Sequence, residues 1–448
     1  ILGWAVFGIA LVTYLSTIEH KFSFWDTGEY ISSAVKLEVT HAPGAALFQL
    51  VGAVAAILSF GNETYYSLII NAMSALFSAF TILFLFWTIT HLVRRILNKE
   101  MEELSPAEMI SVLFSGVIGS LAFTFSDTFW YSAVEGEVYS MASMFIALVV
   151  WLITKWENEY HDSDSQRWII LIFFIVGLSV GVHMMVMLAV PAVCFIYYAR
   201  NYKFTWKNFI IANFITLGVL AFVFKGIFPI VMRLFGKSEI FFVNSIGLPF
   251  HSGTIIAFMI LVAFCYYIIR YTRKTKNNLY QTAALSVVYM IIGFSCWMMI
   301  PIRANANPPM NLNNPDTAIG MLDYYNREQY GDWPTIYGQN YTAHLDAHGI
   351  ERNEDGGYKT IKTGDVYEKN EETGKYEKID ERTSYVYNKE HVSFLPRMYN
   401  SDKTVMNNYV SMYGAPDFEF NYSNEKVVDN PHAKEAFEQL KALSLIHI

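Results

Sequence analysis

The chain has 448 residues, of which 53% are hydrophobic and 16% are charged, against about 25% charged in an average soluble protein. The deficit is local. Residues 1–300 contain 17 basic and 17 acidic residues, whereas residues 301–448 contain 15 and 23, so that the whole net charge of −8 lies in the second part. The first part therefore has the composition of a membrane protein and the second that of a soluble domain. A nucleic-acid binder needs a basic face, and none is visible, which excludes nucleic acid as the main partner.

Neither end of the chain resembles a natural terminus. It begins at Ile1 inside an apolar run, and its last six residues, 443–448, resemble the translation of a sequencing adapter. We expect a fragment truncated at both ends, in which the genuine sequence stops near Ala442, and we assign no function to residues 443–448.

Nine apolar stretches approach the length of about 20 residues that a membrane-spanning helix needs. They are residues 1–17, 65–93, 109–126, 138–154, 168–182, 184–199, 208–225, 254–270 and 279–300. The stretch 43–60 is a tenth candidate. Because it follows the turn His41-Ala42-Pro43-Gly44 and ends in a short polar segment, we favour a helix that lies along the membrane interface.

Basic residues indicate how such a protein is oriented, since cytoplasmic loops carry an excess of Lys and Arg. With nine spans, one side carries twelve: Arg94, Arg95, Lys99, Lys155, Arg167, Arg200, Lys203, Lys207, Arg270, Arg273, Lys274 and Lys276. The other side carries five up to residue 300. The segments 18–42, 127–137, 182–184, 226–253 and the chain after Pro301 then share the non-cytoplasmic side. Every unusual polar cluster of the membrane part lies in one of these segments.

The first cluster is Phe24-Trp25-Asp26-Thr27-Gly28-Glu29-Tyr30, just outside the first predicted span. Two carboxylates three residues apart suit a general base with a helper, and partial desolvation by Phe24 and Trp25 would raise a carboxylate pKa. The same spacing is also typical of a capping box at the start of a helix. Both interpretations stay open at this point.

The second cluster, Phe129 to Tyr139, contains Glu135 and Glu137 at the start of a predicted span. Carboxylates at a span boundary can simply face water. Burial deeper in the bilayer would cost about 2.5–3.5 kcal/mol per acidic group and would demand a partner or a role. Two glutamates among aromatic residues are more than a solvated helix end requires.

Two further motifs lie at predicted helix ends. Gly177-Leu178-Ser179-Val180-Gly181 matches Gly-x-Ser-x-Gly, but a nucleophile elbow needs a strand before it, so we interpret Gly177 and Gly181 as positions of close helix packing. His183 follows at a break between two short spans and could donate a hydrogen bond to a phosphate or a sugar. Arg303 lies just beyond the last span, where it could bind an anionic group bidentately or extend to lipid phosphates.

The region after residue 300 is predicted to be a soluble, non-cytoplasmic α+β region over 301–442. It opens with a connector rich in Pro and Asn over 301–315, and partial alternation over 351–392 predicts hairpin strands. The preceding residues 1–300 form the predicted membrane domain, with 18–64 as its first non-cytoplasmic loop.

Sequence motifs for several kinds of enzyme chemistry are absent. The sequence has no Walker A loop, no dinucleotide-binding glycine motif and no His-Glu-x-x-His, which argues against a nucleotide-using enzyme or pump. It also shows no set of residues spaced like metal ligands, so a divalent metal is left open.

Taken together, the motifs at 24–30, 41–44, 129–139, 181–183 and 301–305 resemble the bacterial members of the family that includes transmembrane protein 260. The resemblance covers about residues 1–345. It implies a protein O-mannosyltransferase with the α-helical C-type glycosyltransferase membrane fold, in which an acidic motif in the first non-cytoplasmic loop is followed by helices lying on the membrane. It further implies a polyprenyl-phosphate sugar donor, with mannose as the expected sugar, and Ser/Thr hydroxyls of exported proteins as acceptors.

The roles that we expect follow from this resemblance. Asp26 is the catalytic base of a single displacement with inversion, and Glu29 orients the acceptor or the base. The substrate-binding residues are Glu135, Glu137, His183, Arg303, His41, Trp25 and Asn307, with Arg303 and His183 on the leaving phosphate. The expected location is the bacterial inner membrane, with the active site on the periplasmic face.

Two rival functions remain open. The same fold could transfer a sugar to a glycolipid or a polysaccharide instead of a protein. A transporter or flippase predicts internal repeats and helices broken at the midplane; the sequence shows one candidate break and no repeat.

Overall fold

The structure is a computed structural model that describes residues 1–394 except 163, 332, 333, 335, 340–342 and 344–348, and beyond residue 394 only 404, 405 and 408. Residues 443–448, assigned above to an adapter, and most of the tail after 394 lie outside the described residues. The chain forms two compact units, Ile1–Arg327 and Glu328–Ile448, and each is described by itself.

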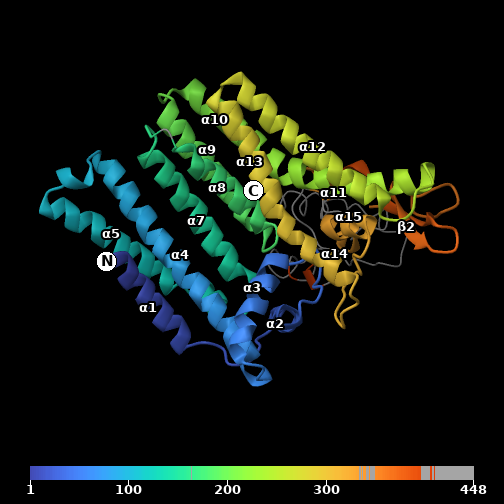
Figure 1. Cartoon of the computed structure of the whole chain (residues 1–448), viewed down its shortest axis with the longest axis horizontal. Helices are drawn as coiled ribbons and strands as arrows, with labels where there is room; N and C mark the ends of the chain where they lie inside the picture. The colour runs from blue at the N-terminus through green and yellow to red at the C-terminus, as the bar shows by residue number, and fades with distance from the viewer. Residues whose placement is uncertain are drawn as a thin grey trace, which may run out of the picture. The chain divides into compact units, whose positions relative to one another are not determined.

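The first unit is helical (Figure 1). Its α-helices are α1 (Leu2–Ser16), α2 (Thr27–Lys36), α3 (Ala46–Ala56), α4 (Tyr66–Leu97), α5 (Pro106–Thr124), α6 (Asp127–Ala133), α7 (Val138–Asn158), α8 (Gln166–Ser179), α9 (Val190–Asn201), α10 (Trp206–Ala221), α11 (Phe228–Ile240), α12 (Ser252–Thr275), α13 (Asn278–Phe294), α14 (Met299–Ala304) and α15 (Ala318–Asn326). Short helical turns join several of them: η1 (Ile57–Ser59), η2 (Glu63–Tyr65), η3 (Met101–Glu103), η4 (Met184–Ala189), η5 (Phe222–Ile227), η6 (Phe241–Ser245) and η7 (Ser295–Met298).

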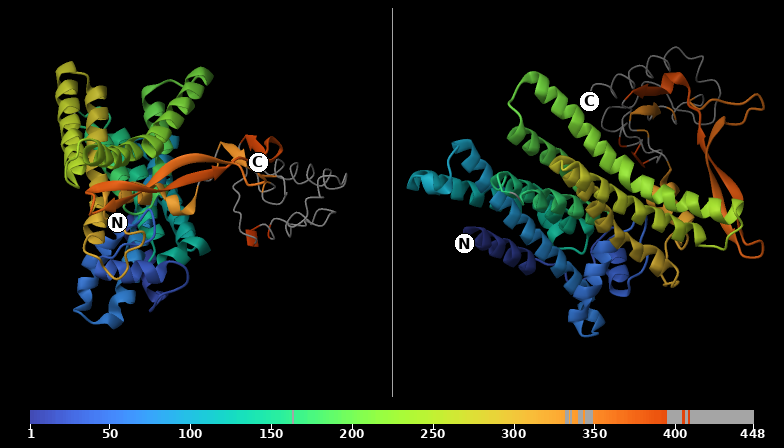
Figure 2. Two further views of the ribbon diagram at one scale, coloured as in Figure 1. Left: turned by 90° about the vertical axis from the view of Figure 1, so that its right-hand side faces the viewer. Right: turned by 45° about the horizontal axis from the view of Figure 1, so that its top comes forward.

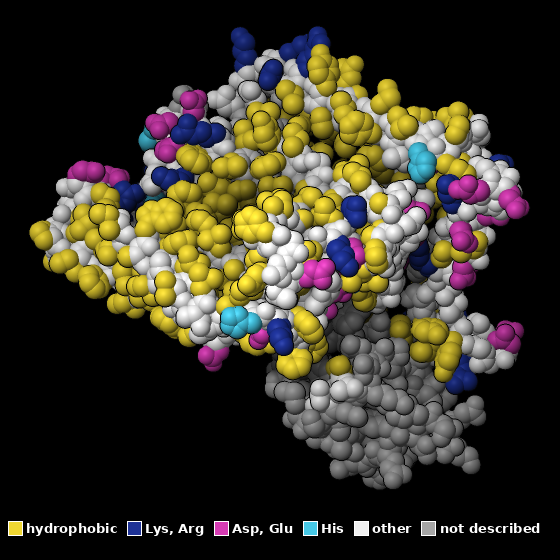
Figure 3. All heavy atoms as spheres, turned by 60° about the horizontal axis from the view of Figure 1, so that its bottom comes forward, with side chains coloured by type: hydrophobic (Ala, Val, Ile, Leu, Met, Phe, Trp, Pro, Cys, Tyr) yellow, Lys and Arg dark blue, Asp and Glu magenta, His cyan; other side chains and the backbone are white. Residues whose placement is uncertain are grey.

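Seven helical segments of the described chain are long and apolar enough to cross a membrane. They are Glu63–Leu97, Pro106–Thr124, Val138–Asn158, Met184–Asn201, Trp206–Ser245, Ser252–Thr275 and Asn278–Ala304. Hydrophobic side chains cover much of the face seen in Figure 3, as expected for a surface in contact with lipid. The chain thus has the helices of an integral membrane protein.

The nine-span prediction is not confirmed. The first and fifth predicted spans form α1 and α8, which have 15 and 14 residues. At 1.5 Å per residue these helices are about 21–23 Å long, less than the hydrocarbon thickness of about 30 Å. The stretch 43–60 forms α3 and η1 and is likewise too short to be among the seven; its location along the membrane interface stays a prediction.

The structure confirms the break at 182–184 and corrects the loop predicted at 226–253. His183 has an extended backbone between α8 and η4. From Trp206, however, the helix continues through η5 and α11 to Ser245. The helix can continue here because α11 packs against α15 and α12. These contacts bury one face of a segment whose sequence predicts a polar loop.

Close helix contacts explain the glycines of α8 and the turn after it. A Cβ atom on Gly177 would lie 2.0 Å from the carbonyl oxygen of Met290 on α13, and one on Gly181 would lie 2.8 Å from Cys296 Sγ. Both positions therefore require glycine, as the packing interpretation predicted. The contact joins α8 and α13 directly beside the break that carries His183.

Residues 301–327 pack with the helical unit, so the boundary between compact units lies 27 residues beyond the predicted one at 300/301. The reason is a set of contacts that tie this segment back to residues 37–44, described below. In the second unit, β2 (Thr360–Asn370) and β3 (Lys375–Tyr385) form an antiparallel hairpin (Figure 2). This confirms the strands predicted over 351–392. A second pair joins β1 (Tyr337–Gln339) and β4 (Val392–Phe394), and the described residues of this unit also include the turns η8 (Glu328–Tyr330) and η10 (Lys389–His391).

Candidate functional site

The acidic motifs meet at one end of the helical unit, where α2 and α3 lie beside the ends of α4 and α7 (Figure 1). Asp26 and Glu29 come from the start of α2, His41 from the loop that follows it, and Glu135 and Glu137 from the turn before α7. These segments are far apart in sequence, so the fold itself assembles the cluster.

The carboxylates of α2 do not form the capping box that their spacing allows. Helix α2 begins directly after Asp26, but the Asp26 side chain makes no capping hydrogen bond. The Glu29 carboxylate instead binds His41, whose backbone N–H and ring Nδ1 lie 2.7 and 3.0 Å from the same Oε1. Both carboxylates are therefore directed to the cluster and not to the helix backbone.

His41 links the two carboxylates. Its ring Nδ1 contacts Glu29, and its Nε2 lies 3.9 Å from Asp26 Oδ2. The hydrogen bond with Glu29 raises the pKa of His41 above its ordinary value. Burial opposes ionisation of Glu29, but the hydrogen bonds from His41 outweigh it and lower the pKa of Glu29. The pair therefore favours its charged form, while the Asp26 side chain stays 55% exposed and accessible to a substrate from water.

The loop over residues 37–44, which carries His41, is held by the segment after α13. Arg303 Nε and Nη2 donate to the carbonyls of Leu37 and Lys36 at 2.5 and 3.3 Å, at the end of α2. This position suits a cation, because the carbonyl end of a helix is negatively polarised. Tyr324 on α15 donates to the carbonyls of Thr40 and His41.

Backbone and side-chain bonds complete the support of the same loop. Val39 N–H donates to the Met310 carbonyl at 3.0 Å, and Trp297 Nε1 donates to the Pro43 carbonyl at 3.0 Å. The loop is thus positioned by residues more than 250 positions later in the chain, which explains why residues 301–327 belong to the helical unit.

The two glutamates before α7 are buried, with exposed fractions of 8% for Glu135 and 7% for Glu137. Ser23 donates a hydrogen bond to Glu135, which partly offsets the rise that burial causes in the pKa of Glu135. Burial, together with the negative charges of Glu135 and Asp26, raises the pKa of Glu137 to about 7. A group with such a pKa exchanges protons near neutral pH, as catalytic acids and bases do.

Gly136, between the two glutamates, brings them to α2 and α4. A Cβ atom on Gly136 would lie 2.9 Å from Asn71 Oδ1 and 3.0 Å from side-chain carbons of Ile31 and Ile70. Only glycine allows this close approach, so the turn that presents the carboxylates depends on it.

His183 lies at the edge of the same cluster, where its ring packs against that of Tyr139 at 5.4 Å. Its Nδ1 accepts a hydrogen bond from Met185 N–H, which leaves the proton of the neutral ring on Nε2. Burial, and then the charge of Arg327, lower the pKa of His183. The charge of Arg327, the residue after α15, also opposes the rise in the pKa of His41.

Phe24 and Trp25 are placed differently from expectation, whereas Asn307 and Arg303 lie after the last predicted span, as expected from the sequence. Phe24 and Trp25 are 80% and 90% exposed, so they do not desolvate the carboxylates; Glu29 is half-buried by its contacts with His41 and its surroundings. Asn307 is exposed and lies three residues after the end of α14. Arg303 makes its hydrogen bonds to backbone carbonyls of α2, and whether it contacts a phosphate stays a prediction.

A divalent cation could be held where the motifs meet. Asp26, Glu29 and His41 can each place one ligand atom within 4.8 Å of the others. Oxygen and imidazole ligands of this kind suit several divalent metals.

Sequence reasoning missed Ser23, Tyr324 and Arg327. Ser23 is adjacent to the first motif and could have been included with it. Tyr324 and Arg327 carry no local signal, because their relevance comes only from the packing of α15 near His41.

Comparisons with known proteins bear on the same segments. Residues 26–206 match the family described as protein O-mannosyl-transferase TMEM260 N-terminal domain, a range that includes every site residue from Asp26 to His183. Residues 331–437 match a family of unknown function, DUF8416.

Two curated relatives give the same indication. The protein O-mannosyl-transferase TMEM260 of Mus musculus is 27% identical over 176 residues, which are 39% of this chain and 22% of the mouse protein. The protein O-mannosyl-transferase tmem260 of Dictyostelium discoideum is 25% identical over 215 residues, which are 46% of this chain and 24% of that protein. The aligned regions thus span less than a quarter of either relative. No solved structure matches the chain.

Proposed function

Since residues 26–206 carry the N-terminal domain of the TMEM260 family of protein O-mannosyl-transferases, we propose that this chain is a membrane glycosyltransferase that transfers mannose from a polyprenyl-phosphate donor to Ser/Thr hydroxyls of exported proteins. The observation that carries the proposal is the cluster of Asp26, Glu29, His41, Glu135 and Glu137, which lies inside the matched range. We propose further that the helical unit has the C-type glycosyltransferase fold and that the cluster faces the non-cytoplasmic side of the membrane.

In the proposed reaction the acceptor hydroxyl attacks the anomeric carbon of the sugar in one displacement with inversion. A bond forms between the acceptor oxygen and this carbon, while the bond from the carbon to the phosphate oxygen breaks. Asp26 takes the hydroxyl proton, and polyprenyl phosphate leaves with the bonding electron pair. The exposure of the Asp26 carboxylate supports this role, because an acceptor peptide must reach the base from water.

Glu29 and His41 position the base. Their hydrogen bond holds the imidazole ring so that Nε2 points toward Asp26, at 3.9 Å from its Oδ2. This contact fixes the position of the Asp26 carboxylate relative to the ring. We therefore assign Glu29 to orienting His41, and through it Asp26.

Glu135 and Glu137 are suited to binding the sugar. Buried carboxyl groups form strong hydrogen bonds with hydroxyl groups, since the local dielectric constant is low. Because the pKa of Glu137 is about 7, it can donate as well as accept near neutral pH. The same property makes Glu137 the alternative base if Asp26 is not required.

The leaving phosphate gains negative charge as the bond to the sugar breaks, so groups that stabilise it accelerate the reaction. His183 can donate a hydrogen bond from Nε2–H to the phosphate, and the positive charge of Arg327 can stabilise the phosphate electrostatically. Arg303 fixes the end of α2, and its remaining Nη1 group is a further candidate contact for the phosphate.

The test uses this chain in liposomes with radiolabelled polyprenyl-phosphate mannose and a Ser/Thr peptide. We expect Asp26→Asn to lower transfer by about 10²–10⁴-fold with donor binding retained, whereas Asp127→Asn, at an exposed position at the start of α6, serves as the matched control. Full activity of Asp26→Asn would refute the base assignment and make Glu137 or Glu29 the next candidate. Transfer to lipid but to no peptide would instead identify a glycolipid-directed enzyme.

A further inference from the structure

Two cavities meet at His161, at the end of the helices remote from the candidate site, and the first extends along the helices as far as Phe173, Ile227 and Met290. The first, which we call the apolar cavity, has a volume of about 920 Å³ and lies between α7, α8, α9, α10 and α13. The second, the basic cavity, has a volume of about 740 Å³ and lies where α4, α7 and α9 end. His161 lines both. Helix α7 runs from Glu137 to this end, and its 21 residues separate the cavities' shared rim from the candidate site by about 30 Å.

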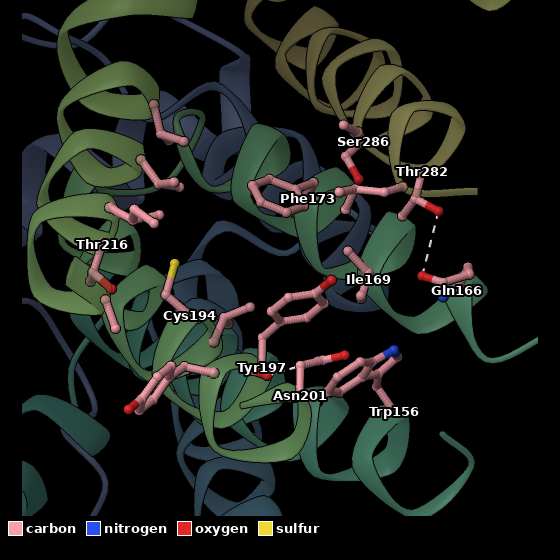
Figure 4. Close-up of a pocket in the computed structure, with 18 of the residues that line it drawn as sticks. Trp156, Gln166, Ile169, Phe173, Cys194, Tyr197, Asn201, Thr216, Thr282 and Ser286 are labelled. Atoms are coloured by element: carbon pink, nitrogen blue, oxygen red, sulfur yellow. Dashed lines mark hydrogen bonds between the residues drawn. The ribbon is translucent and has the colours of Figure 1, made fainter. Parts of the chain in front are cut away.

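The apolar cavity has the size of a ligand site, which is typically about 300–1,000 Å³. Phe173 and Ile169 on α8 face Cys194 on α9 and Thr216 on α10 across it (Figure 4). Its walls are mostly aliphatic and aromatic, so an apolar chain fits them.

Polar atoms without partners interrupt these apolar walls. Trp156 Nε1, Tyr198 OH and Ser286 Oγ are shielded from water and have no hydrogen-bond partner among the described residues. Trp156 and Ser286 are only 1% and 4% exposed. Because buried polar groups are normally hydrogen-bonded, an occupant with oxygen atoms near these three groups would satisfy them.

The basic cavity carries more positive than negative charge. It is lined by three arginines and two glutamates. Arg94 pairs with Glu100, and Arg95 pairs with Glu157 at 3.0 Å. Within each pair the positive and the negative charge offset each other, which leaves Arg200 as the additional cation.

Arg200 lines the basic cavity next to His161, the residue that both cavities share. Its Nη2 lies 3.0 Å from His161 Nε2, and its guanidinium stacks over the Tyr160 ring at 4.7 Å. The described residues place no carboxylate within ion-pair distance of it, and its buried Nε has no partner among them. An anionic group at this junction would contact Arg200 directly.

We propose that the two cavities together bind one glycerophospholipid with an anionic headgroup, taken from the leaflet opposite the candidate site. The headgroup lies in the basic cavity against Arg200, the ester oxygens lie near Trp156, Tyr198 and Ser286, and an acyl chain fills the apolar cavity. Basic pockets between membrane helices on the basic-loop side recognise such headgroups. The isoprenoid tail of a sugar donor fits less well, because a hydrocarbon offers no oxygen to the three unpartnered groups.

The experiment does not depend on transferase activity. The purified chain is equilibrated with an equimolar mixture of phosphatidylglycerol and phosphatidylcholine, excess lipid is removed with detergent, and retained lipids are counted by native mass spectrometry. We expect the wild type to retain phosphatidylglycerol preferentially. Arg200→Gln should lower this preference about fivefold, the effect of one basic residue near an anionic headgroup. Arg270→Gln, an exposed position on α12 outside both cavities, should leave it unchanged.

A cavity-filling variant tests the acyl-chain site separately. Ala212 lines the apolar cavity on α10, so Ala212→Phe should reduce retention of both lipids. Equal preference in Arg200→Gln and Arg270→Gln would overturn the proposal, as would a wild type that retains no lipid. Displacement of phosphatidylglycerol by added polyprenyl phosphate would also overturn it and would assign the cavities to the donor lipid.

Discussion

Replacing Glu137 by Gln is expected to stabilise the protein, and to do so increasingly as the pH rises. Burial and the neighbouring charges of Glu135 and Asp26 raise the pKa of Glu137 from 4.5 to about 7 in the folded protein. Below pH 4.5 the carboxyl group is protonated in both the folded and the unfolded chain, so its burial has no ionisation cost. Between pH 4.5 and 7 the unfolded chain ionises while the folded chain does not, and stability falls.

The magnitude follows from this difference in pKa. One pKa unit corresponds to about 1.36 kcal/mol, so above pH 7 the buried carboxylate lowers the free energy of unfolding by about 3 kcal/mol. At pH 5 the same reasoning gives about 1 kcal/mol. Gln keeps the shape of the side chain and cannot ionise, so it removes the cost.

The assay is thermal unfolding of wild type and Glu137→Gln in detergent, followed by intrinsic fluorescence at pH 5 and pH 8. The variant should have the higher melting temperature at pH 8 and a much smaller advantage at pH 5. Glu102→Gln, at an exposed position before α5, measures the effect of the same substitution on the surface. A stabilisation of Glu137→Gln that is equal at both pH values, or a loss of stability at pH 8, would refute the reasoning.

Three further predictions concern the residues that shape the cluster. Glu29→Gln should lower thermal stability more at pH 6 than at pH 9. Because the pKa of His41 is raised in the folded protein, its hydrogen bond with Glu29 stabilises the fold fully below pH 6.5 and less as the pH rises past the pKa of the folded state. Melting curves that shift equally at both pH values would contradict this prediction. Arg303→Ala removes two charge-assisted hydrogen bonds to the last carbonyls of α2 and should cost about 1.5–3 kcal/mol, measured by urea unfolding; an unchanged midpoint would show that Arg303 does not hold α2. Gly136→Ala forces a Cβ atom to within 2.9 Å of a neighbouring side chain and should cost about 1–3 kcal/mol, together with weaker sugar-donor binding in a titration; a variant with wild-type melting temperature and affinity would refute the tight packing of this turn.

The sequence predicted well whatever depends on local composition. Long apolar runs predicted seven of the nine proposed spans as helices of sufficient length, since a helix is the only way for a single segment to satisfy its backbone in lipid. Alternation and turn residues predicted the β2–β3 hairpin. The acidic motifs were found because carboxylates are rare in apolar surroundings.

Other features depend on contacts between distant segments. The sequence of residues 226–245 predicts a polar loop, whereas the structure has a helix there. Nothing in the sequence of this segment shows that α15 covers one face of α11. The sequence placed Arg303 on the same side of the membrane as the carboxylates but could not show that the carbonyls of α2 accept its hydrogen bonds. Likewise, the residue type of Trp25 predicts neither its exposure nor its positive φ of 61°.

The role of Arg327 shows the same limitation most clearly. It is separated from His41 by 286 positions and sits one residue after a short helix, yet its charge acts on both histidines of the cluster. Tyr324, three residues earlier, donates to the carbonyls of Thr40 and His41 and so ties α15 to this loop. A basic residue in a connecting segment has many possible surroundings, and the sequence does not select among them.

The proposed activity is the transfer of a hexose to a protein hydroxyl. The most direct measurement is mass spectrometry of a Ser/Thr peptide after incubation with the reconstituted chain and polyprenyl-phosphate mannose. Our account predicts a peptide that gains one hexose at a Ser or Thr oxygen with the wild-type chain and remains unmodified with Asp26→Asn. A peptide that stays unmodified with the wild type, while donor is bound and consumed, would contradict it.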